Sequence, residues 1–153
     1  MLVDMLGNYM KEALVLAFEA YENGEVPVGA VIVKDKEIIG RGRNRREQNK
    51  NALSHAEIEA IEQACLYTGD WRLSGCDLYV TLEPCPMCAG AIINSRIDRL
   101  IYGAADNKAG AAESIINLFA LPFNHKPQVI AGIMEKECGE ILAKFFKGLR
   151  HCE

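Results

Sequence analysis

Strand-like and helix-like segments alternate along most of this chain, and that order restricts the fold more than any other feature of the sequence. We predict strands at 28–33, 38–44, 77–82, 100–104 and 128–131. The first two are joined only by a short charged turn, which is typical of an antiparallel hairpin. The later strands are separated by helical segments, and such crossovers place strands in parallel. The sequence therefore predicts an α/β fold with three α/β/α layers: a five-stranded mixed sheet with helices on both faces.

The helical segments show apolar residues at helical spacing. We predict helices that end at Asn23-Gly24, that run from Ser54 to Thr68-Gly69, that begin at Pro86 and end near Asn94, that lie around 113–119, and that run from Glu135 to Leu149. The first includes Leu14, Ala17, Phe18 and Tyr21. The second carries Ile58, Ile61 and either Ala64 or Cys65 on its predicted buried face. The last has an apolar stripe of Cys138, Ile141, Leu142 and Phe145, which predicts packing on the sheet. Without linkers or repeats, residues 1–153 are predicted to form a single domain.

Charge and hydropathy exclude several classes of protein. The 17 basic and 21 acidic side chains give a net charge of −4, so the chain as a whole is not that of a typical nucleic-acid binder. No apolar run approaches the roughly 18 residues of a membrane span, and Asp4 stands where a secretory signal carries Lys or Arg. We therefore expect a cytoplasmic protein with no membrane contact. Its cysteines are then thiols, and the isolated ones are expected to be buried or incidental: Cys65, Cys76, Cys138 and Cys152.

The residues with distinctive chemistry gather at two helix starts. Cys85 and Cys88 form a Cys-x-x-Cys pair around Pro86, where the free backbone N–H groups of a helix start favour thiolates. His55, at the start of another helix, offers an imidazole. Two thiolates and one imidazole leave the fourth position of a zinc ion for water, which is typical of catalytic zinc. Glu57 is the candidate that moves protons at that water.

Each of these residues also has an ordinary explanation. Ser54-x-x-Glu57 is a capping-box pattern, a lone histidine is usually structural, and a Cys-x-x-Cys pair also occurs in structural zinc sites and redox pairs. A structural zinc site needs a fourth ligand nearby, yet the other cysteines show no paired spacing and only His125 and His151 remain. A redox pair requires no His-x-Glu upstream. The combination of His-x-Glu with a later Pro-Cys-x-x-Cys is the known signature of zinc-dependent nucleobase deaminases.

At these residues the sequence resembles the cytidine and deoxycytidylate deaminase superfamily, and within it the bacterial tRNA-specific adenosine deaminases. The resemblance covers nearly the whole chain. Its further blocks are EVPVGA at 25–30, LYVTLEP at 78–84, MCAGAI at 87–92, SRI at 95–97, GAA at 110–112 and NH at 124–125. It implies a cytidine-deaminase-like fold, whose five strands between helices match the predicted order of elements.

The resemblance also implies an activity and a set of site residues. The activity is hydrolytic deamination of adenosine to inosine at the wobble position of a tRNA anticodon, with release of ammonia. His55, Cys85 and Cys88 would hold one zinc ion per chain, with Glu57 as the proton shuttle. The remaining residues would contact the substrate: Asn44 and the backbone of Ala56 orient the base, Val28 lines its pocket, and Asp106 and Asn124 approach the flanking nucleotides. The implied partners are the anticodon loop of tRNA and a second copy of the chain.

Two local basic segments bear on the substrate. Residues 41–50 hold five basic side chains against Glu47 alone, a local charge of +4, and residues 143–151 add three basic side chains and no acid beside Phe145 and Phe146. Each segment is either an ordinary solvated surface or a surface for RNA, on which one of the two aromatic rings stacks on a base.

Two departures from the family pattern keep other functions open. Residues 51–54 read Asn-Ala-Leu-Ser where the family usually has an Asp-Pro-Thr-Ala-like stretch, and Ala105 replaces a residue that is commonly basic. A deaminase of a free nucleobase or nucleoside, such as guanine or cytosine, is therefore the alternative enzyme. A zinc-dependent nucleic-acid-binding module without catalysis is the alternative from another class.

The helix after the zinc motif is too apolar for one buried face. Met87, Ala91, Ile92 and Ile93 all fall within it. We therefore expect a homodimer, since a self-complementary two-fold contact is the commonest closed assembly.

Overall fold

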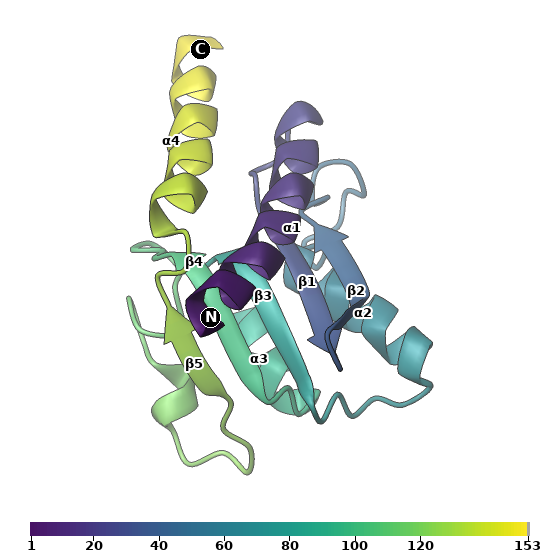
Figure 1. The fold of residues 1–153 in the computed structure, drawn as a ribbon. Helices are drawn as coiled ribbons and strands as arrows, with labels where there is room; N and C mark the ends of the chain where they lie inside the picture. Colours follow the sequence, from purple (N-terminus) through teal and green to yellow (C-terminus); the bar gives the residue numbers. More distant parts are fainter. Residues whose placement is uncertain (153) are drawn as a thin grey trace.

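One five-stranded sheet organises residues 1–152, the part of the chain that the computed structural model describes, with side chains described through residue 149. The elements are α1 (Leu2–Glu22), β1 (Gly29–Lys34), β2 (Glu37–Arg43), α2 (Ala56–Thr68), β3 (Cys76–Leu82), α3 (Pro86–Asn94), β4 (Arg99–Ala104), the 3₁₀ helix η1 (Leu118–Ala120), β5 (Gln128–Ala131) and α4 (Glu135–Cys152). The strand order is β2-β1-β3-β4-β5 (Figure 1). β1 is antiparallel to β2 and β3, while β3, β4 and β5 are parallel. The predicted hairpin and mixed sheet are therefore confirmed.

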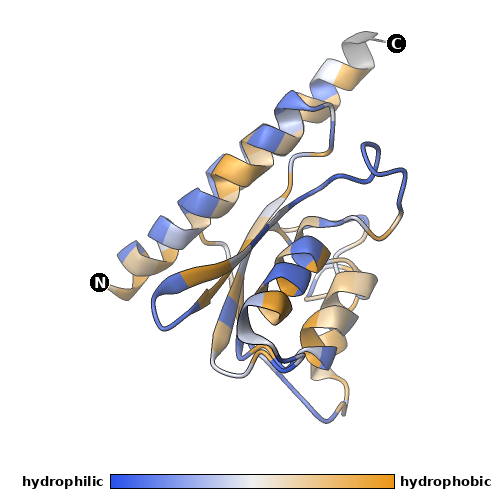
Figure 2. Ribbon diagram, turned by 90° about the vertical axis from the view of Figure 1, so that its right-hand side faces the viewer, coloured by the Kyte–Doolittle hydropathy of each residue, from blue (hydrophilic) through white to orange (hydrophobic). Residues whose placement is uncertain are grey.

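Alternate residues of the strands face opposite layers of helices. Ala30 and Ile32 of β1 belong to a buried cluster that includes residues of α2 and α3. Val31 and Val33 belong to a second cluster with residues of α1 and α4. Figure 2 shows the two long helices on one side of the sheet and the two shorter helices on the other. The α/β/α arrangement predicted from the sequence is thus confirmed.

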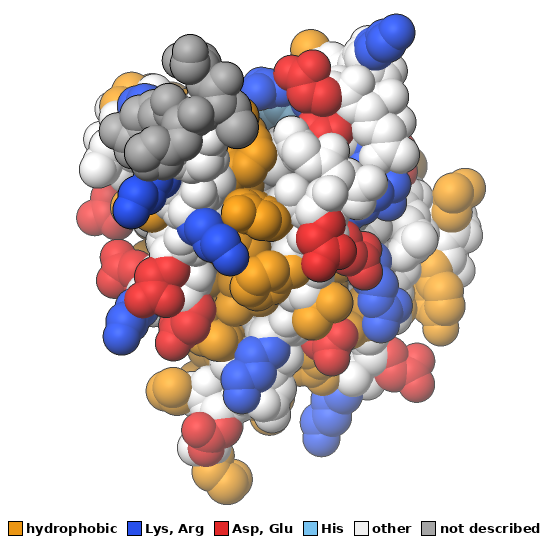
Figure 3. All heavy atoms as spheres, turned by 90° about the horizontal axis from the view of Figure 1, so that it is seen from above, with side chains coloured by type: hydrophobic (Ala, Val, Ile, Leu, Met, Phe, Trp, Pro, Cys, Tyr) orange, Lys and Arg blue, Asp and Glu red, His pale blue; other side chains and the backbone are white. Residues whose placement is uncertain are grey.

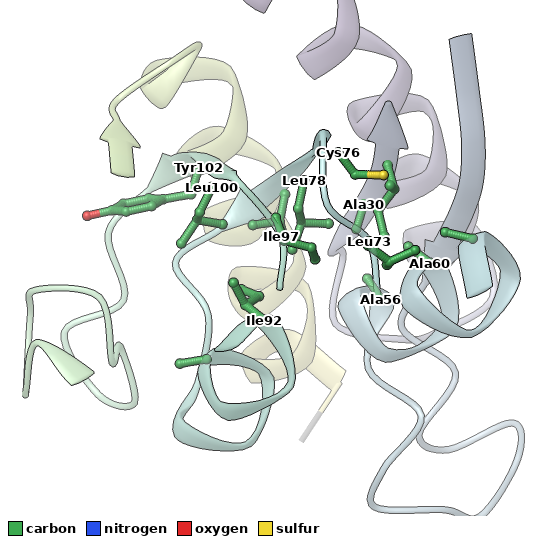
Figure 4. Packing of buried hydrophobic residues seen from close by; sticks show 14 of the residues in the cluster. Ala30, Ala56, Ala60, Leu73, Cys76, Leu78, Ile92, Ile97, Leu100 and Tyr102 are labelled. Carbon is green, nitrogen blue, oxygen red and sulfur yellow. The ribbon is translucent and has the colours of Figure 1, made fainter. Parts of the chain in front are cut away.

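Small residues bring α2 unusually close to β2. Ala56, Ala60 and Ala64 are the buried alanines of this helix, and Figure 4 shows the first two turned toward the sheet core. Opposite them, β2 has Gly40 and Gly42, where a Cβ atom would overlap the carbonyl oxygens of Ala60 and Ala56 respectively. The helix backbone therefore lies directly on the strand, and this contact sets the position of the first turn of α2.

The buried face of α2 differs in part from the prediction, and that of α1 differs at one residue. Ile58 and Ile61 are only partly buried, because the glycines of β2 let the alanine face of α2 pack instead. In α1, Leu14 and Ala17 are buried and Tyr21 is partly buried, as predicted, but Phe18 is 51% exposed. By contrast, Cys138, Ile141 and Phe145 of α4 are buried, as the spacing predicts.

The helix predicted around 113–119 is wrong. Turns and irregular backbone lead to η1 at Leu118–Ala120. The backbone N–H groups of Ala112, Glu113 and Ser114 donate to the side chain of Glu83. The N–H groups that follow do not continue a helical pattern, since Ile115 donates to the Gly110 carbonyl and Leu118 to the Ala111 carbonyl instead of to the residue four positions earlier.

An apolar groove separates α1 from α4, with Leu14, Phe18 and Ile141 among its lining residues. The view from above in Figure 3 shows hydrophobic side chains in a stripe flanked by charged ones. Across residues 1–152, no helix combines the length and apolar character needed to cross a bilayer. The assignment of residues 1–153 to one domain stays a prediction.

Candidate metal centre and cavity

The helices α2 and α3 begin close to each other, and residues at the start of each helix meet in one site. His55 is the N-cap of α2 and Cys85 is the N-cap of α3, both with extended backbone conformations. Pro86 occupies the start of α3, where its fixed φ angle suits the helix and its missing N–H is not needed. The strand β3 leads directly to Cys85, and the loop after β2 leads to His55. The fold therefore joins two segments that are 30 residues apart in the sequence.

His55, Cys85 and Cys88 are spaced as a tetrahedral ion requires. The Nδ1 atom of His55 lies 3.6 Å from the Sγ atoms of both cysteines, and all three ligand-type atoms lie within 4.8 Å of one another. An ion bonded to sulfur at about 2.3 Å and to nitrogen at about 2.0–2.1 Å in tetrahedral geometry separates those atoms by about 3.6 Å. Two thiols and one imidazole are also the donors that zinc prefers. The donor set and its spacing therefore fit a zinc ion.

His55, Cys85 and Cys88 shift one another's pKa values. A hydrogen bond from the Cys88 thiol, with further help from His55 and the Cys88 backbone, lowers the pKa of Cys85 to about 4. The same contact with Cys85 raises the pKa of Cys88, and burial raises it further. The hydrogen bond with Cys85 also raises the pKa of His55. A bound cation would take the place of the contacts between His55 Nδ1 and the two sulfur atoms once the thiols lose their protons.

Glu57 lies beside this group and is not part of it. Its side chain is only 4% exposed, and burial raises the pKa of its carboxyl to about 7. It occupies the first turn of α2, two residues after His55. The capping-box explanation is wrong: the N-cap is His55, and no side chain caps this helix. Ser54 instead accepts a hydrogen bond from the Asn49 amide at 3.1 Å.

A cavity of about 180 Å³ opens at Glu57 and the metal-ligand group. It is lined by Val26, Val28, Asn44, Arg46, His55, Ala56, Glu57, Leu82, Glu83, Cys85, Asp106 and Ala109. Pockets for drug-sized ligands usually measure about 300–1,000 Å³, so this one has room for a single ring system. The structure therefore brings Val28, Asn44, Ala56 and Asp106 to one cavity, although their individual roles stay predictions.

Two expected site residues are not among the cavity lining: Cys88, which is buried behind it in the metal-ligand group, and Asn124. The side chain of Asn124 is exposed in the segment before β5. The neighbouring His125 is half-buried, with its Nε2 atom 2.7 Å from the Ile97 carbonyl oxygen. Its location at the turn into β5 agrees with a structural role for the histidine, and the contact of Asn124 with a flanking nucleotide stays a prediction.

Two buried carboxylates support the cavity walls, and the sequence alone did not identify them. Glu25 is 1% exposed and accepts hydrogen bonds from the backbone N–H groups of Glu47 and Gln48 at 3.0 and 2.7 Å. Glu83 is 2% exposed and is one of the residues that line the cavity. Glu25 precedes Val26 and Glu83 precedes Pro84 in the blocks that carry the family resemblance, but their hydrogen-bond partners are distant in the sequence. Arg46, which also lines the cavity, was missed as a site residue as well.

The basic segments are only partly free to meet RNA. Arg43 is 7% exposed, with its Nε atom 3.9 Å from a carboxylate oxygen of Glu19. Arg45 pairs with Glu59 at 3.0 Å. These two arginines are therefore engaged in ion pairs within the fold, while the choice between a solvated surface and an RNA surface for the rest of residues 41–50 stays open. In α4, Lys144 is exposed.

The two aromatic residues of the C-terminal segment have different environments. Phe145 is buried, whereas Phe146 is 46% exposed. Phe145 thus belongs to the core, as its place in the predicted apolar stripe of the last helix implies, and Phe146 is the ring at the surface. Of the isolated cysteines, Cys76 and Cys138 are buried and Cys65 is partly buried. Cys152 lies outside the described side chains.

Comparisons with known proteins agree with this site. Residues 6–150 match the family model of the MafB19-like deaminases. The tRNA-specific adenosine deaminase of Bacillus subtilis (strain 168) is 50% identical over 143 residues, which make up 93% of this chain and 89% of that protein. The tRNA-specific adenosine deaminase of Agrobacterium fabrum (strain C58) is 49% identical over 144 residues, or 94% of this chain and 95% of that protein.

Solved structures of deaminases resemble this chain in fold and in sequence. A structure from a study of A-to-I editing by tRNA:A34 deaminases at the wobble position has a TM-score of 0.86 and 50% identity, covering 88% of this chain and 99% of that one. A guanine deaminase from Bacillus subtilis has a TM-score of 0.61 and 33% identity, covering 76% of this chain and 85% of that one. The chain therefore belongs to the MafB19-like deaminase family and, within it, to the tRNA-specific adenosine deaminases.

Proposed function

We propose that this protein is a zinc-dependent enzyme that deaminates the wobble adenosine of a tRNA anticodon to inosine and releases ammonia. The observation that carries the proposal is the placement of buried Glu57 beside the His55, Cys85 and Cys88 group, in a cavity with room for one base. The 50% identity to the Bacillus subtilis tRNA-specific adenosine deaminase supports the choice of substrate. Such an enzyme works where tRNA is found, so we also propose the cytoplasm as its location.

His55, Cys85 and Cys88 are the proposed ligands of one zinc ion per chain. When bound, zinc lowers the pKa of a water molecule from 15.7 to about 7 and so supplies a nucleophile at neutral pH. The two helix starts hold the ligand side chains on rigid elements, which favours a fixed geometry. Two thiolates and a neutral imidazole also balance the charge of the cation, so the site tolerates burial.

Glu57 moves the protons in this mechanism. Its carboxylate accepts a proton from the attacking water and passes it to the ring nitrogen beside C6 of adenine. The water oxygen bonds to C6, and Glu57 then carries the remaining proton of that oxygen to the exocyclic nitrogen. The bond between C6 and this nitrogen breaks, ammonia leaves, and the oxygen stays on C6 as the carbonyl oxygen of inosine. Because Glu57 belongs to the same helix start as His55, the proton carrier and a metal ligand keep a constant separation.

The other cavity residues are proposed to hold the base. The amide of Asn44 donates to the Val26 carbonyl at 3.2 Å and accepts from the Arg46 N–H at 3.0 Å, so its orientation is set by the protein. Each of its ends retains capacity for one further hydrogen bond, to the base. The backbone of Ala56 and the apolar wall at Val28 complete this pocket, and the opposite wall carries Asp106, proposed to approach a flanking nucleotide.

The assembly is proposed to be a homodimer. Ile92 and Ile93 of α3 are buried in the core, but Met87 and Ala91 remain partly exposed. Leu66 of α2, the helix on the same side of the sheet, is 85% exposed. A second copy of the chain would cover this apolar surface. Light scattering at micromolar concentration should give twice the 16.9 kDa mass of one chain, and a monomer would contradict the proposal.

The mechanism is tested by Glu57→Gln, which keeps the size of the side chain and removes its capacity to accept a proton. The variant should retain zinc and lose turnover by about 10²–10⁴-fold, the usual contribution of a general acid–base group. Zinc is measured by metal analysis, and inosine by sequencing a tRNA that carries wobble adenosine. Turnover close to that of the wild-type protein would overturn the assignment of Glu57.

A further inference from the structure

Glu83 is a buried carboxylate at the cavity wall, and it has no role in the proposed zinc chemistry. It stands between the end of β3 and Cys85. Its Oε2 atom accepts three backbone hydrogen bonds, from the N–H groups of Ala112, Glu113 and Ser114 at 3.0, 2.8 and 2.9 Å. One oxygen of this side chain therefore organises three consecutive peptide groups from a distant part of the chain.

The second oxygen of Glu83 holds the other end of the same segment. Oε1 accepts hydrogen bonds from the backbone N–H of Asp106, at 3.0 Å, and from the Ser114 hydroxyl. Between these ends the chain passes so close that a Cβ atom at Gly110 would overlap the Glu83 carboxyl group. All five partners donate and none accepts, so only a group with two acceptor oxygens satisfies them.

The segment that Glu83 organises contributes two residues to the cavity, Asp106 and Ala109. No α-helix or strand supports it, because turns and irregular backbone fill the chain from the end of β4 at Ala104 to η1. The Oδ1 atom of Asp106 accepts from the N–H groups of Lys108 and Ala109 at 3.0 and 3.1 Å. Within residues 1–149, no donor meets its Oδ2 atom, which is thus available to a substrate.

We propose that Glu83 is a positioning residue that folds residues 106–114 into the cavity wall and so holds Asp106 against the nucleotide beside the reactive base. The proposal rests on the function proposed above, in which Asp106 approaches that nucleotide. Glu83 touches neither the base nor the metal ligands in this role; it acts through the backbone of the segment that carries Asp106.

The first test is Glu83→Gln, which keeps the shape of the side chain but turns one oxygen into an NH₂ group that faces N–H donors. We expect unchanged zinc content and a KM for a wobble-adenosine stem-loop that rises about tenfold or more, with a smaller change in kcat, because at least two buried donors lose their acceptor. The matched control is Glu22→Gln, the same change on an exposed carboxylate at the end of α1, and it should leave KM unchanged.

A double-mutant cycle separates positioning from general loss of structure. Asp106→Ala should raise KM by itself, and Glu83→Gln should add little in that background, because the residue through which it acts is gone. If Glu83→Gln does not fold, Ser114→Ala takes its place: it removes one donor, keeps the carboxylate, and should raise KM by less than tenfold with the same lack of additivity.

Three results would overturn the inference while the wild-type protein deaminates tRNA: a wild-type KM in the Glu83 and Ser114 variants, additive effects in the cycle, or loss of zinc in Glu83→Gln. A wild-type protein that does not deaminate the stem-loop would instead overturn the proposed function.

Discussion

Gly42→Ala should damage both stability and catalysis, because it forces a Cβ atom between β2 and the first turns of α2. That atom would lie 2.7 Å from the Ala60 nitrogen and 2.8 Å from the Glu59 Cβ atom, and it would overlap the Ala56 carbonyl oxygen. Ordinary contacts need about 3.5–4.0 Å, so the helix must retreat by about 1 Å. Overpacking of this kind costs about 1–3 kcal/mol or more, and each kcal/mol lowers the Tm of a chain of this size by about 2–4 °C.

The same displacement reaches the site, because the first turn of α2 carries His55 and Glu57. A misplacement of about 1 Å can reduce catalysis about 10²-fold, so kcat/KM for tRNA deamination should fall by about that factor. The matched control is Gly7→Ala in α1, where nothing lies within 4 Å of an added Cβ. There the change should stabilise the helix by about 0.5–1 kcal/mol and leave activity unchanged.

Thermal unfolding and initial rates are compared at one protein and one zinc concentration, since bound metal and assembly both shift Tm. A Gly42→Ala protein that melts at the wild-type temperature and keeps full activity would refute this account of the α2–β2 contact.

Three further predictions concern the ligands, the buried thiol and the RNA surface. Replacement of Cys85 or Cys88 by Ser should reduce bound zinc well below one per chain, and metal analysis that finds a full equivalent in the double variant would show that the ligands are misassigned. Cys138 should resist alkylation in the folded protein and react after unfolding, because burial raises the pKa of its thiol to about 12; mass spectrometry of the labelled peptide measures this, and fast labelling of native protein would contradict it. Joint replacement of the exposed Lys144 and Lys147 by Ala should weaken tRNA binding and reduce the salt slope by about two phosphate contacts, whereas an unchanged slope would remove α4 from the RNA surface.

Periodicity and motif spacing predicted most of the fold because the relevant signals are local. The hairpin turn, Pro86 at a helix start and the stripe of α4 each depend on neighbouring residues, and the strand–helix order then leaves few topologies. The errors arise where a residue distant in the sequence determines the local structure. The 113–119 segment has helical apolar spacing, but Glu83, about 30 residues away, captures its N–H groups. Likewise, the glycines of β2 determine that α2 buries its alanines and leaves Ile61 partly exposed.

The candidate site divides in the same way. The ligand-type residues and Glu57 could be named from the sequence because their chemical types are unusual and their spacing is short. Glu25 and Glu83 could not, since a glutamate carries no sign that its partners will be backbone N–H groups from distant loops. Arg43 shows the reverse error: its place in a basic run suggested an RNA contact, but burial beside Glu19 commits it to the fold.

The central claim is that the substrate is a wobble adenosine in tRNA, and one measurement tests it most directly. Purified zinc-loaded protein is incubated in parallel with a tRNA anticodon stem-loop that carries wobble adenosine and with free guanine, cytosine and adenosine, and both inosine and ammonia are quantified. The account predicts inosine at the wobble position, one ammonia per inosine, and little ammonia from the free compounds. Ammonia from a free base, with every wobble adenosine unchanged, would contradict the account and make the protein a nucleobase deaminase.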